Sequence, residues 1–148
     1  MVVGATPKEM LDRGFSEPVG ESFAVFIHPE TGDKWALART EELTGDSYKE
    51  FDVRADENVS LEEDLLQRDL RINAIAKNPQ TDELIDLHGG LKDIDAEILH
   101  HVSPAFAEDP LRVIRVATFT ACFPEFDVHP DTADICEKLV PQLATIST

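Results

Sequence analysis

The chain contains 148 residues, of which 42% are hydrophobic, and its 13 basic and 30 acidic residues give a formal net charge of −17. This length and hydrophobic content suit one domain, or slightly more than one, with a real core. The negative charge repels phosphate backbones, so a nucleic-acid contact has to rest on a few local Arg and Lys residues or on parts outside this chain. No apolar run approaches about 18 residues, so we expect no membrane partner. Cys122 and Cys136 have neither metal-binding spacing nor a secretory context, so we expect reduced thiols and a cytoplasmic location.

The first residues of the chain predict a strand followed by a short helix. Residues 1–4 read as the middle of a strand, so we expect the chain to be a fragment or the product of an internal start. Thr6 suits a helix cap, Pro7 fits the first helical position, and Glu9 completes a capping box. Gly14 is expected to end this helix.

Two strands and a long loop are expected next. The strands should cover residues 22–27 and 34–40, and the turn residues between them, 28–33, predict a hairpin. Residues 41–59 are polar with few apolar anchors, so they are expected to form a mobile loop.

The second half of the chain predicts more helix. Ser60, with Glu63 at the capping-box position, should begin a long helix that ends near Lys77. Further elements are expected as short strands over 83–87 and 98–102 and helices over 109–123 and 130–140. Strands in the first half and helices in the second indicate an α+β fold, with a weak boundary near residues 102–104.

Asp69 lies on the apolar stripe of the helix expected after Ser60, and Asn73 follows it by one helical turn. A buried carboxylate is costly unless it is paired or hydrogen-bonded. One interpretation is a structural ion pair with Arg68 or Arg112. The other is that Asp69 and Asn73 hold the hydroxyl groups of a ribose while Arg68 reaches a phosphate.

The helix expected from Asp109 carries a second group of charged residues. Asp109 followed by Pro110 has a structural interpretation as a helix cap, with Glu108 complementing the helix dipole. That interpretation leaves Arg112 and Arg115 unexplained. Asp109 and Arg112 are spaced to present acceptor and donor atoms side by side, as one edge of a base pair does. Arg115, one turn further on, could meet a triphosphate or stack.

These segments resemble motifs of the bacterial CCA-adding tRNA nucleotidyltransferases, the class II group that shares its head domain with bacterial poly(A) polymerases. Residues 67–74 resemble the R-R-D-x-x-x-N-A motif, and residues 108–112 resemble the E-D-x-x-R motif. The segment H-V-S-P-A-F at 101–106 favours the CCA-adding branch. The resemblance covers essentially the whole chain. It implies a partial, polymerase β-like nucleotidyltransferase head with a small mixed sheet over 1–103, passing into the start of a helical neck over 104–148.

The resemblance also implies a reaction and a set of nucleotide-binding residues. The family adds C, C and A to the tRNA 3′ end from CTP and ATP and releases pyrophosphate, with two Mg²⁺ ions. Asp109 and Arg112 would read the Watson–Crick edge of the incoming base. The ribose and phosphates would be held by the remaining members of the expected site: Arg68, Asp69, Asn73 and Arg115.

The chain also departs from the family pattern. The family's phosphate-binding turn and its D-x-D metal carboxylates precede the segment that matches Val2-Val3-Gly4, so we assign no catalytic residue and no Mg²⁺ ligand within this chain. Lys34 replaces an expected acidic residue, and Gln67 and Thr118 replace arginines. The tRNA would be gripped mainly by regions absent here. Alternatives are a non-catalytic nucleotide-binding remnant, a bacterial poly(A) polymerase relative, and an acidic α/β domain whose helices carry only structural ion pairs.

Overall fold

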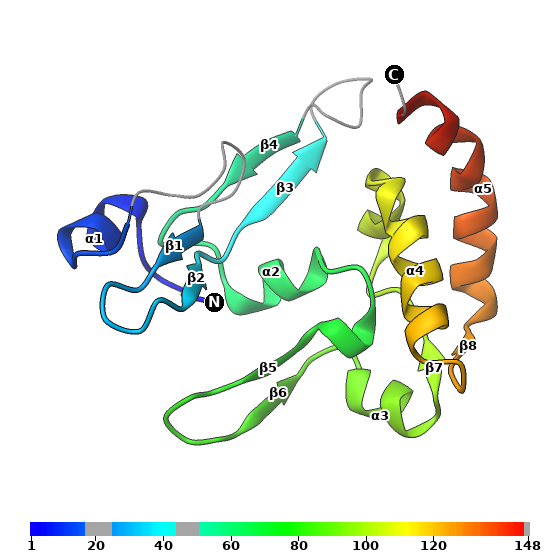
Figure 1. Ribbon diagram of the computed structural model, residues 1–148, viewed down its shortest axis with the longest axis horizontal. Helices are drawn as coiled ribbons and strands as arrows, with labels where there is room; N and C mark the ends of the chain where they lie inside the picture. The colour runs from blue at the N-terminus through cyan, green and yellow to red at the C-terminus, as the bar shows by residue number, and fades with distance from the viewer. Residues whose placement is uncertain (17–24, 44–50, 147–148) are drawn as a thin grey trace. The chain divides into compact units, whose positions relative to one another are not determined.

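The computed structural model describes residues 1–16, 25–43 and 51–146 (Figure 1). These residues form two compact units, 1–64 and 65–148, and the division falls inside helix α2 (Leu61–Leu66). The predicted change from head to neck at residues 103 and 104 lies within the second unit and stays a prediction.

The first unit begins with the predicted capped helix. Helix α1 (Pro7–Asp12) has the expected capping box, because the backbone N–H of Thr6 donates to the Glu9 carboxylate at 2.8 Å and the Glu9 N–H donates back to the Thr6 hydroxyl. Strands β1 (Val25–Ile27) and β2 (Lys34–Ala36) form the predicted antiparallel hairpin. Residues 22–24 of the first expected strand lie outside the described residues.

The predicted loop over 41–59 is wrong at residues 41–43 and 51–54, which belong to strands, whereas residues 55–59 lie outside helix and strand as expected. Strand β3 (Thr40–Leu43) pairs antiparallel with β4 (Phe51–Arg54), with Thr40 opposite Arg54. The polar composition misled the prediction because cross-strand backbone pairing can hold a polar segment extended. Residues 44–50 lie outside the described residues. The core of this unit gathers around Met10, Phe26 and Leu37.

The predicted helix from Ser60 to Lys77 is also wrong beyond its first turns. The Ser60–Glu63 capping box is present, but α2 ends at Leu66. Leu70 is extended and bridges antiparallel to His101, residues Arg71–Asn73 form a 3₁₀ helix, and β5 covers Ile75–Lys77. The helix stops because the N–H of Leu70 donates to the side chain of Asp69 instead of to a helical carbonyl, a competition typical of Asp.

The rest of the second unit contains both predicted and unexpected elements. Strand β6 (Leu84–Asp86) pairs antiparallel with β5, as a hairpin. Helix α3 (Gly90–Asp95) was not predicted; its first N–H groups donate to the Asp86 carboxylate at 2.8 and 2.9 Å. The expected strand over 98–102 is reduced to β7 (Ile98–Leu99), which pairs in parallel with β8 (Asp127–Val128).

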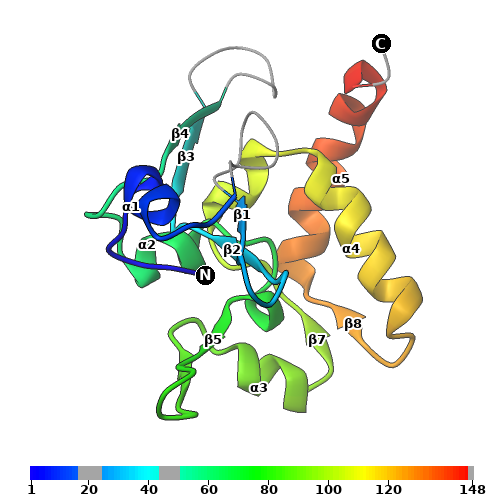
Figure 2. The ribbon, with the colours of Figure 1, turned by 60° about the vertical axis from the view of Figure 1, so that its left-hand side comes forward.

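Helices α4 (Leu111–Cys122) and α5 (Pro130–Ile146) complete the second unit. They lie side by side in both views (Figures 1 and 2), and α5 extends six residues past its predicted end. A 3₁₀ helix over Pro104–Glu108 precedes α4. The core of this unit consists of buried apolar side chains from its different elements: Leu70, Leu99, Phe106, Val116 and Leu139. Helices with small two-stranded sheets confirm the predicted α+β class.

Two further sequence predictions can be compared with the structure. Cys122 and Cys136 are both free, as expected. Among the residues that the structure describes, none of the helices combines the length and apolar character that a membrane crossing needs.

Candidate functional site

Asp69 lies at the centre of a hydrogen-bonded group in the second unit. It sits in the turn after α2 and is 7% exposed. Its Oδ1 accepts from the N–H of Leu70 at 2.8 Å and from Nδ2 of Asn73 at 3.0 Å. Its Oδ2 accepts from Nε of Arg115 at 2.7 Å. The predicted proximity of Asp69 and Asn73 is therefore present, although a turn and a 3₁₀ helix produce it instead of a continuous α-helix.

The same contacts keep Asp69 ionised. Burial opposes the charged form, but the hydrogen bonds from Asn73, Leu70 and Arg115 outweigh that effect and hold the pKa of the Asp69 carboxyl below its ordinary value. The site thus contains a fixed, buried negative charge.

Arg115 connects α4 to the turn that carries Asp69. It projects from α4, and its side chain is 56% exposed while that of Asp69 is 6% exposed. Its guanidinium carbon also lies 5.9 Å from the centre of the Phe119 ring. The alternative of a structural ion pair therefore holds, with Arg115 as a partner that the sequence did not single out. Helix α2 ends at Leu66, so Asp69 points in a different direction from a residue of the expected continuous helix.

Arg112 is buried and bonded to backbone carbonyls. Its Nη1 donates to the carbonyl oxygen of Ala105 at 2.7 Å and its Nη2 to that of Gln67 at 2.8 Å, and the residue is only 8% exposed. It therefore fastens α4 to the turn that carries Asp69. One N–H on each Nη atom is left over by these contacts.

Asp109 takes the cap position that the structural interpretation predicted, because its backbone is extended and Pro110 after it already has helical backbone angles, with φ −60° and ψ −21°. Its Oδ1 accepts from the N–H of Leu111 at 2.9 Å, and Pro110 stands before the first helical residue. The side chain is half-buried and its second oxygen has no contact of this kind to the helix. Arg68, at the turn, is exposed. The structure thus brings Asp69, Asn73 and Arg115 into direct contact.

The segment 100–103 supports this turn and was not recognised as part of the site. Val102 donates its N–H to the carbonyl of Asp69 at 3.2 Å, and Arg71 donates its N–H to the carbonyl of His100 at 2.9 Å. The hydroxyl of Ser103 donates to the carbonyl of Leu66 at 2.9 Å. In each of these hydrogen bonds the acceptor is a backbone carbonyl of a segment distant in the sequence. Residue types alone do not reveal such contacts.

The carboxylates of this site do not fit Mg²⁺. Three of the roughly four acceptor positions of Asp69 are taken, one of them by a guanidinium that would repel a cation, and one oxygen of Asp109 is held by the helix N-terminus. Mg²⁺ needs near-octahedral oxygen ligands. We therefore assign no reaction step in this chain to a metal ion.

The sequence of this chain is similar to those of known proteins. Residues 4–100 match the family described as the poly A polymerase head domain. The chain belongs to this family. Among its relatives, the CCA-adding enzyme of Coxiella burnetii is 54% identical over 140 residues, which is 95% of this chain and 37% of the relative. The multifunctional CCA protein of Azoarcus sp. is 52% identical over 95% of this chain and 34% of its own length.

Solved structures agree with this assignment. The CCA-adding enzyme of Bacillus stearothermophilus in complex with CTP matches 97% of this chain and 35% of its own chain, with a TM-score of 0.74 and 28% identity. A tRNA nucleotidyltransferase complexed with a primer tRNA and an incoming ATP analog matches 91% of this chain and 37% of its own, with a TM-score of 0.61 and 27% identity. The chain thus spans about a third of the length of the relatives that it matches.

Proposed function

We propose that this chain is the nucleotide-recognising part of a CCA-adding tRNA nucleotidyltransferase, which transfers C, C and A from CTP and ATP to the tRNA 3′ end with release of pyrophosphate. The observation that carries this proposal is that the two family motifs meet, because Arg112 of the second donates to the carbonyl of Gln67 in the first, and Arg115, one turn further on, contacts Asp69. The names of the relatives support the CCA-adding branch over the poly(A) alternative. The family match over residues 4–100 supports a head that ends near residue 103 and a neck that starts near 104.

Ribose and phosphates are assigned to the group around Asp69. The carboxylate keeps one acceptor position, on Oδ2, that can take a ribose hydroxyl. Arg115 uses Nε for Asp69 and is half exposed, so its two Nη atoms can donate to phosphate oxygens. Arg68 is exposed at the same turn and supplies a second guanidinium. Asn73 orients Asp69 and offers the amide oxygen to the sugar.

The base is assigned to Asp109 and Arg112. An ionised carboxylate offers acceptors only, and a guanidinium offers donors only. Cytosine and adenine both present an amino donor beside a ring-nitrogen acceptor, so the pair fits both bases. Uracil and guanine would turn a carbonyl oxygen toward the carboxylate. Since Arg112 is held by two carbonyls, the discrimination rests chiefly on the second oxygen of Asp109.

The remaining partners of the reaction are assigned outside this site. A chain with a net charge of −17 offers no broad surface for tRNA, so contacts to the tRNA 3′ end are assigned mainly to regions beyond these residues. Mg²⁺ is an expectation from the family, with ligands that are not among the residues of this site.

The assignment of Asp109 predicts a change in base preference. The chain without substitutions should bind CTP more tightly than UTP by roughly tenfold or more, because losing a hydrogen bond to a charged group costs about 1.5–3 kcal/mol. Asp109→Ala should remove most of that preference, whereas Arg68→Ala should weaken all four nucleotides alike. Equilibrium dialysis with labelled nucleotides measures both effects.

Asp109→Asn controls for the loss of the helix cap, since Asn caps helices as well as Asp does. It should keep the stability of the chain and still relax the preference for CTP. Substituting the exposed Glu125 by Ala should change neither property. If Asp109→Ala and Asp109→Asn both left the ratio of CTP to UTP affinity intact, Asp109 would be a helix cap and nothing more.

A further inference from the structure

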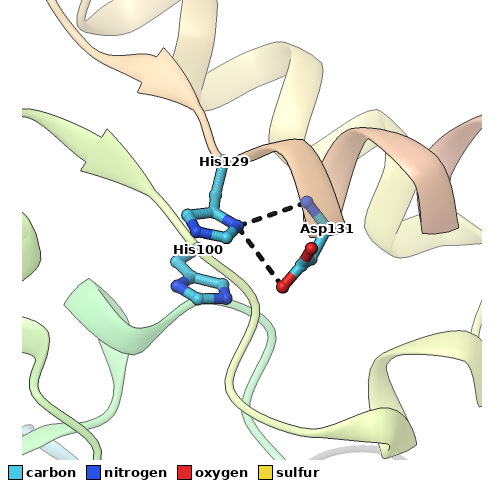
Figure 3. Close-up of side chains that lie close together, drawn as sticks. All are labelled: His100, His129 and Asp131. Carbon is cyan, nitrogen blue, oxygen red and sulfur yellow. Dashed lines mark hydrogen bonds and ion pairs between the residues drawn. The ribbon is translucent and has the colours of Figure 1, made fainter.

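Two histidines and an aspartate meet where β7 and β8 end. The two strands pair in parallel, with Leu99 opposite Val128, so the residues that follow them, His100 and His129, lie next to each other. Asp131 is in the first turn of α5, two residues after His129. Figure 3 shows the three side chains together, with one nitrogen of each imidazole on the side of the Asp131 carboxylate.

The geometry brings their potential ligand atoms close together. One nitrogen from each histidine and one oxygen of Asp131 all lie within 4.8 Å of one another, and this is the one such group among the described residues. The rings of His100 and His129 stack with centroids 3.7 Å apart and planes 4° apart. The backbone N–H of Asp131 donates to Nδ1 of His129 at 3.2 Å, and Oδ2 of Asp131 lies 3.8 Å from that nitrogen.

We propose that His100, His129 and Asp131 form a binding site for a divalent transition-metal ion of the Zn²⁺ class. Imidazole nitrogen and carboxylate oxygen are ordinary ligands of Zn²⁺, whereas Mg²⁺ and Ca²⁺ prefer oxygen alone. Three protein ligands would leave a fourth position for water.

Closing this site requires the side chains to rotate, and an ion on Nδ1 of His129 would replace the hydrogen bond from the N–H of Asp131. Ligands of a tetrahedral ion at about 2.1 Å are about 3.4 Å apart, so the atoms have to approach by somewhat more than an ångström. The histidine rings would turn out of their parallel stack so that both lone pairs point to one ion. His129 and His100 are partly buried and Asp131 is exposed, so the aspartate is free to move toward the rings.

Two neighbouring charges act on the site in opposite directions. Nη2 of Arg71 lies 3.3 Å from Nε2 of His100, and its positive charge opposes a cation there. The buried Asp93 interacts electrostatically with His129, and its Oδ2 has no hydrogen-bond partner among the described residues. Metal binding would displace the Arg71 contact, and Asp93 would offset part of the positive charge.

A bound ion would tie three elements of the second unit together. It would connect the end of β7, the end of β8 and the first turn of α5. Because the carbonyl of His100 accepts the N–H of Arg71, the ion would also stiffen the segment that supports the turn at Asp69. The site is therefore inferred to be structural.

The test is titration of the chelator-treated 148-residue chain with Zn²⁺ by calorimetry, and with Co²⁺ by visible absorption. The expected result is one ion per chain, with a Co²⁺ spectrum of nitrogen and oxygen ligands and a raised thermal unfolding temperature. Asp131→Asn and His129→Gln should each weaken Zn²⁺ binding by at least about tenfold. Millimolar Mg²⁺ should reproduce none of these effects.

His28→Gln is the matched control, since His28 belongs to the first unit and should leave Zn²⁺ affinity unchanged. If His129→Gln fails to fold, Asp131→Asn carries the test because Asp131 is exposed. Equal Zn²⁺ affinity in the wild-type chain and in Asp131→Asn would overturn the proposal. So would binding that is lost in His28→Gln, or no binding at millimolar Zn²⁺.

Discussion

Three donors converge on the carboxylate of Asp69: the N–H of Leu70, the amide of Asn73 and the guanidinium of Arg115. This arrangement is a structural ion pair, and in the proposed function the same residues also hold the nucleotide. As a structural contact it links the turn after α2 with α4. In the proposed ligand site, the half-exposed Arg115 would face the phosphates and the free acceptor position of Asp69 would face the ribose. Of the two interpretations that the sequence left open, the structural ion pair is present, and the nucleotide-binding role stays a prediction.

Substituting Asp69 by Asn should reveal the contribution of its charge. Because the pKa of Asp69 is lower in the folded chain than in the unfolded chain, its stabilisation is present above the unfolded value and is lost as pH falls through the folded value. Asp69→Asn should therefore lower the free energy of unfolding at neutral pH by roughly 1–3 kcal/mol. Because water screens the exposed part of Arg115, we expect a value near the lower end of this range.

Urea unfolding as a function of pH measures this effect. The difference between wild type and Asp69→Asn should shrink as the pH falls below about 4, where the unfolded carboxyl takes up a proton. Glu125→Gln, at an exposed position, should show no comparable difference. If the difference in free energy of unfolding between wild type and Asp69→Asn stayed constant down to the lowest pH measured, the ionisation of Asp69 would contribute nothing to stability.

Arg112 shows why part of the site could not be predicted from residue types. The helix expected from Asp109 is present as α4, which begins at Leu111, and the cap by Asp109 could be predicted directly. The partners of Arg112, however, are the backbone carbonyls of Ala105 and Gln67. Every residue has a carbonyl, so no sequence signal identifies these two.

At the scale of elements, local signals predicted the beginnings of helices better than their ends. The capping boxes at Thr6 and Ser60 are present, because each depends on residues three positions apart. The continuation of the second helix to Lys77 depended on apolar spacing, and the side chain of Asp69 overrode it. Parallel pairing of β7 with β8 joins segments about thirty residues apart and has no local signature.

Gly90 allows α3 to lie close to the 3₁₀ helix Arg71–Asn73, because it has no side chain. A Cβ at this position would overlap the carbonyl oxygen of Arg71 and crowd the side chain of Ile75. Since backbone atoms cannot move aside as a flexible side chain can, Gly90→Ala should lower the free energy of unfolding by about 1–3 kcal/mol, measured by urea unfolding.

Gly89 provides the comparison for that substitution. It has a φ of +79°, and a Cβ there would meet no atom within 4 Å. Asn tolerates this backbone conformation, so Gly89→Asn should cost less than about 1 kcal/mol. If Gly90→Ala were as mild as Gly89→Asn, α3 would not be packed against the 3₁₀ helix as described.

For the whole molecule, the net negative charge disfavours nucleotide binding, whereas the sequence motifs indicate it. A chain with 30 acidic and 13 basic residues repels nucleotides in general, so the proposed nucleotide binding has to depend on the small group of arginines on and near α4. The motifs identified the family and the α+β class, because they combine several residue types at fixed spacings. The division into units at residues 64 and 65 could not be predicted, since it falls inside a helix.

The measurement that tests the central claim most directly is the change in backbone amide NMR signals when CTP is added to the 148-residue chain. The account predicts that the signals that move belong to residues 68–73 and 109–115, while those of α1 stay in place. UTP at the same concentration should produce smaller changes at 109–115. Changes confined to the first unit, or equal changes with CTP and UTP, would contradict a base-selective nucleotide site at Asp69 and Asp109.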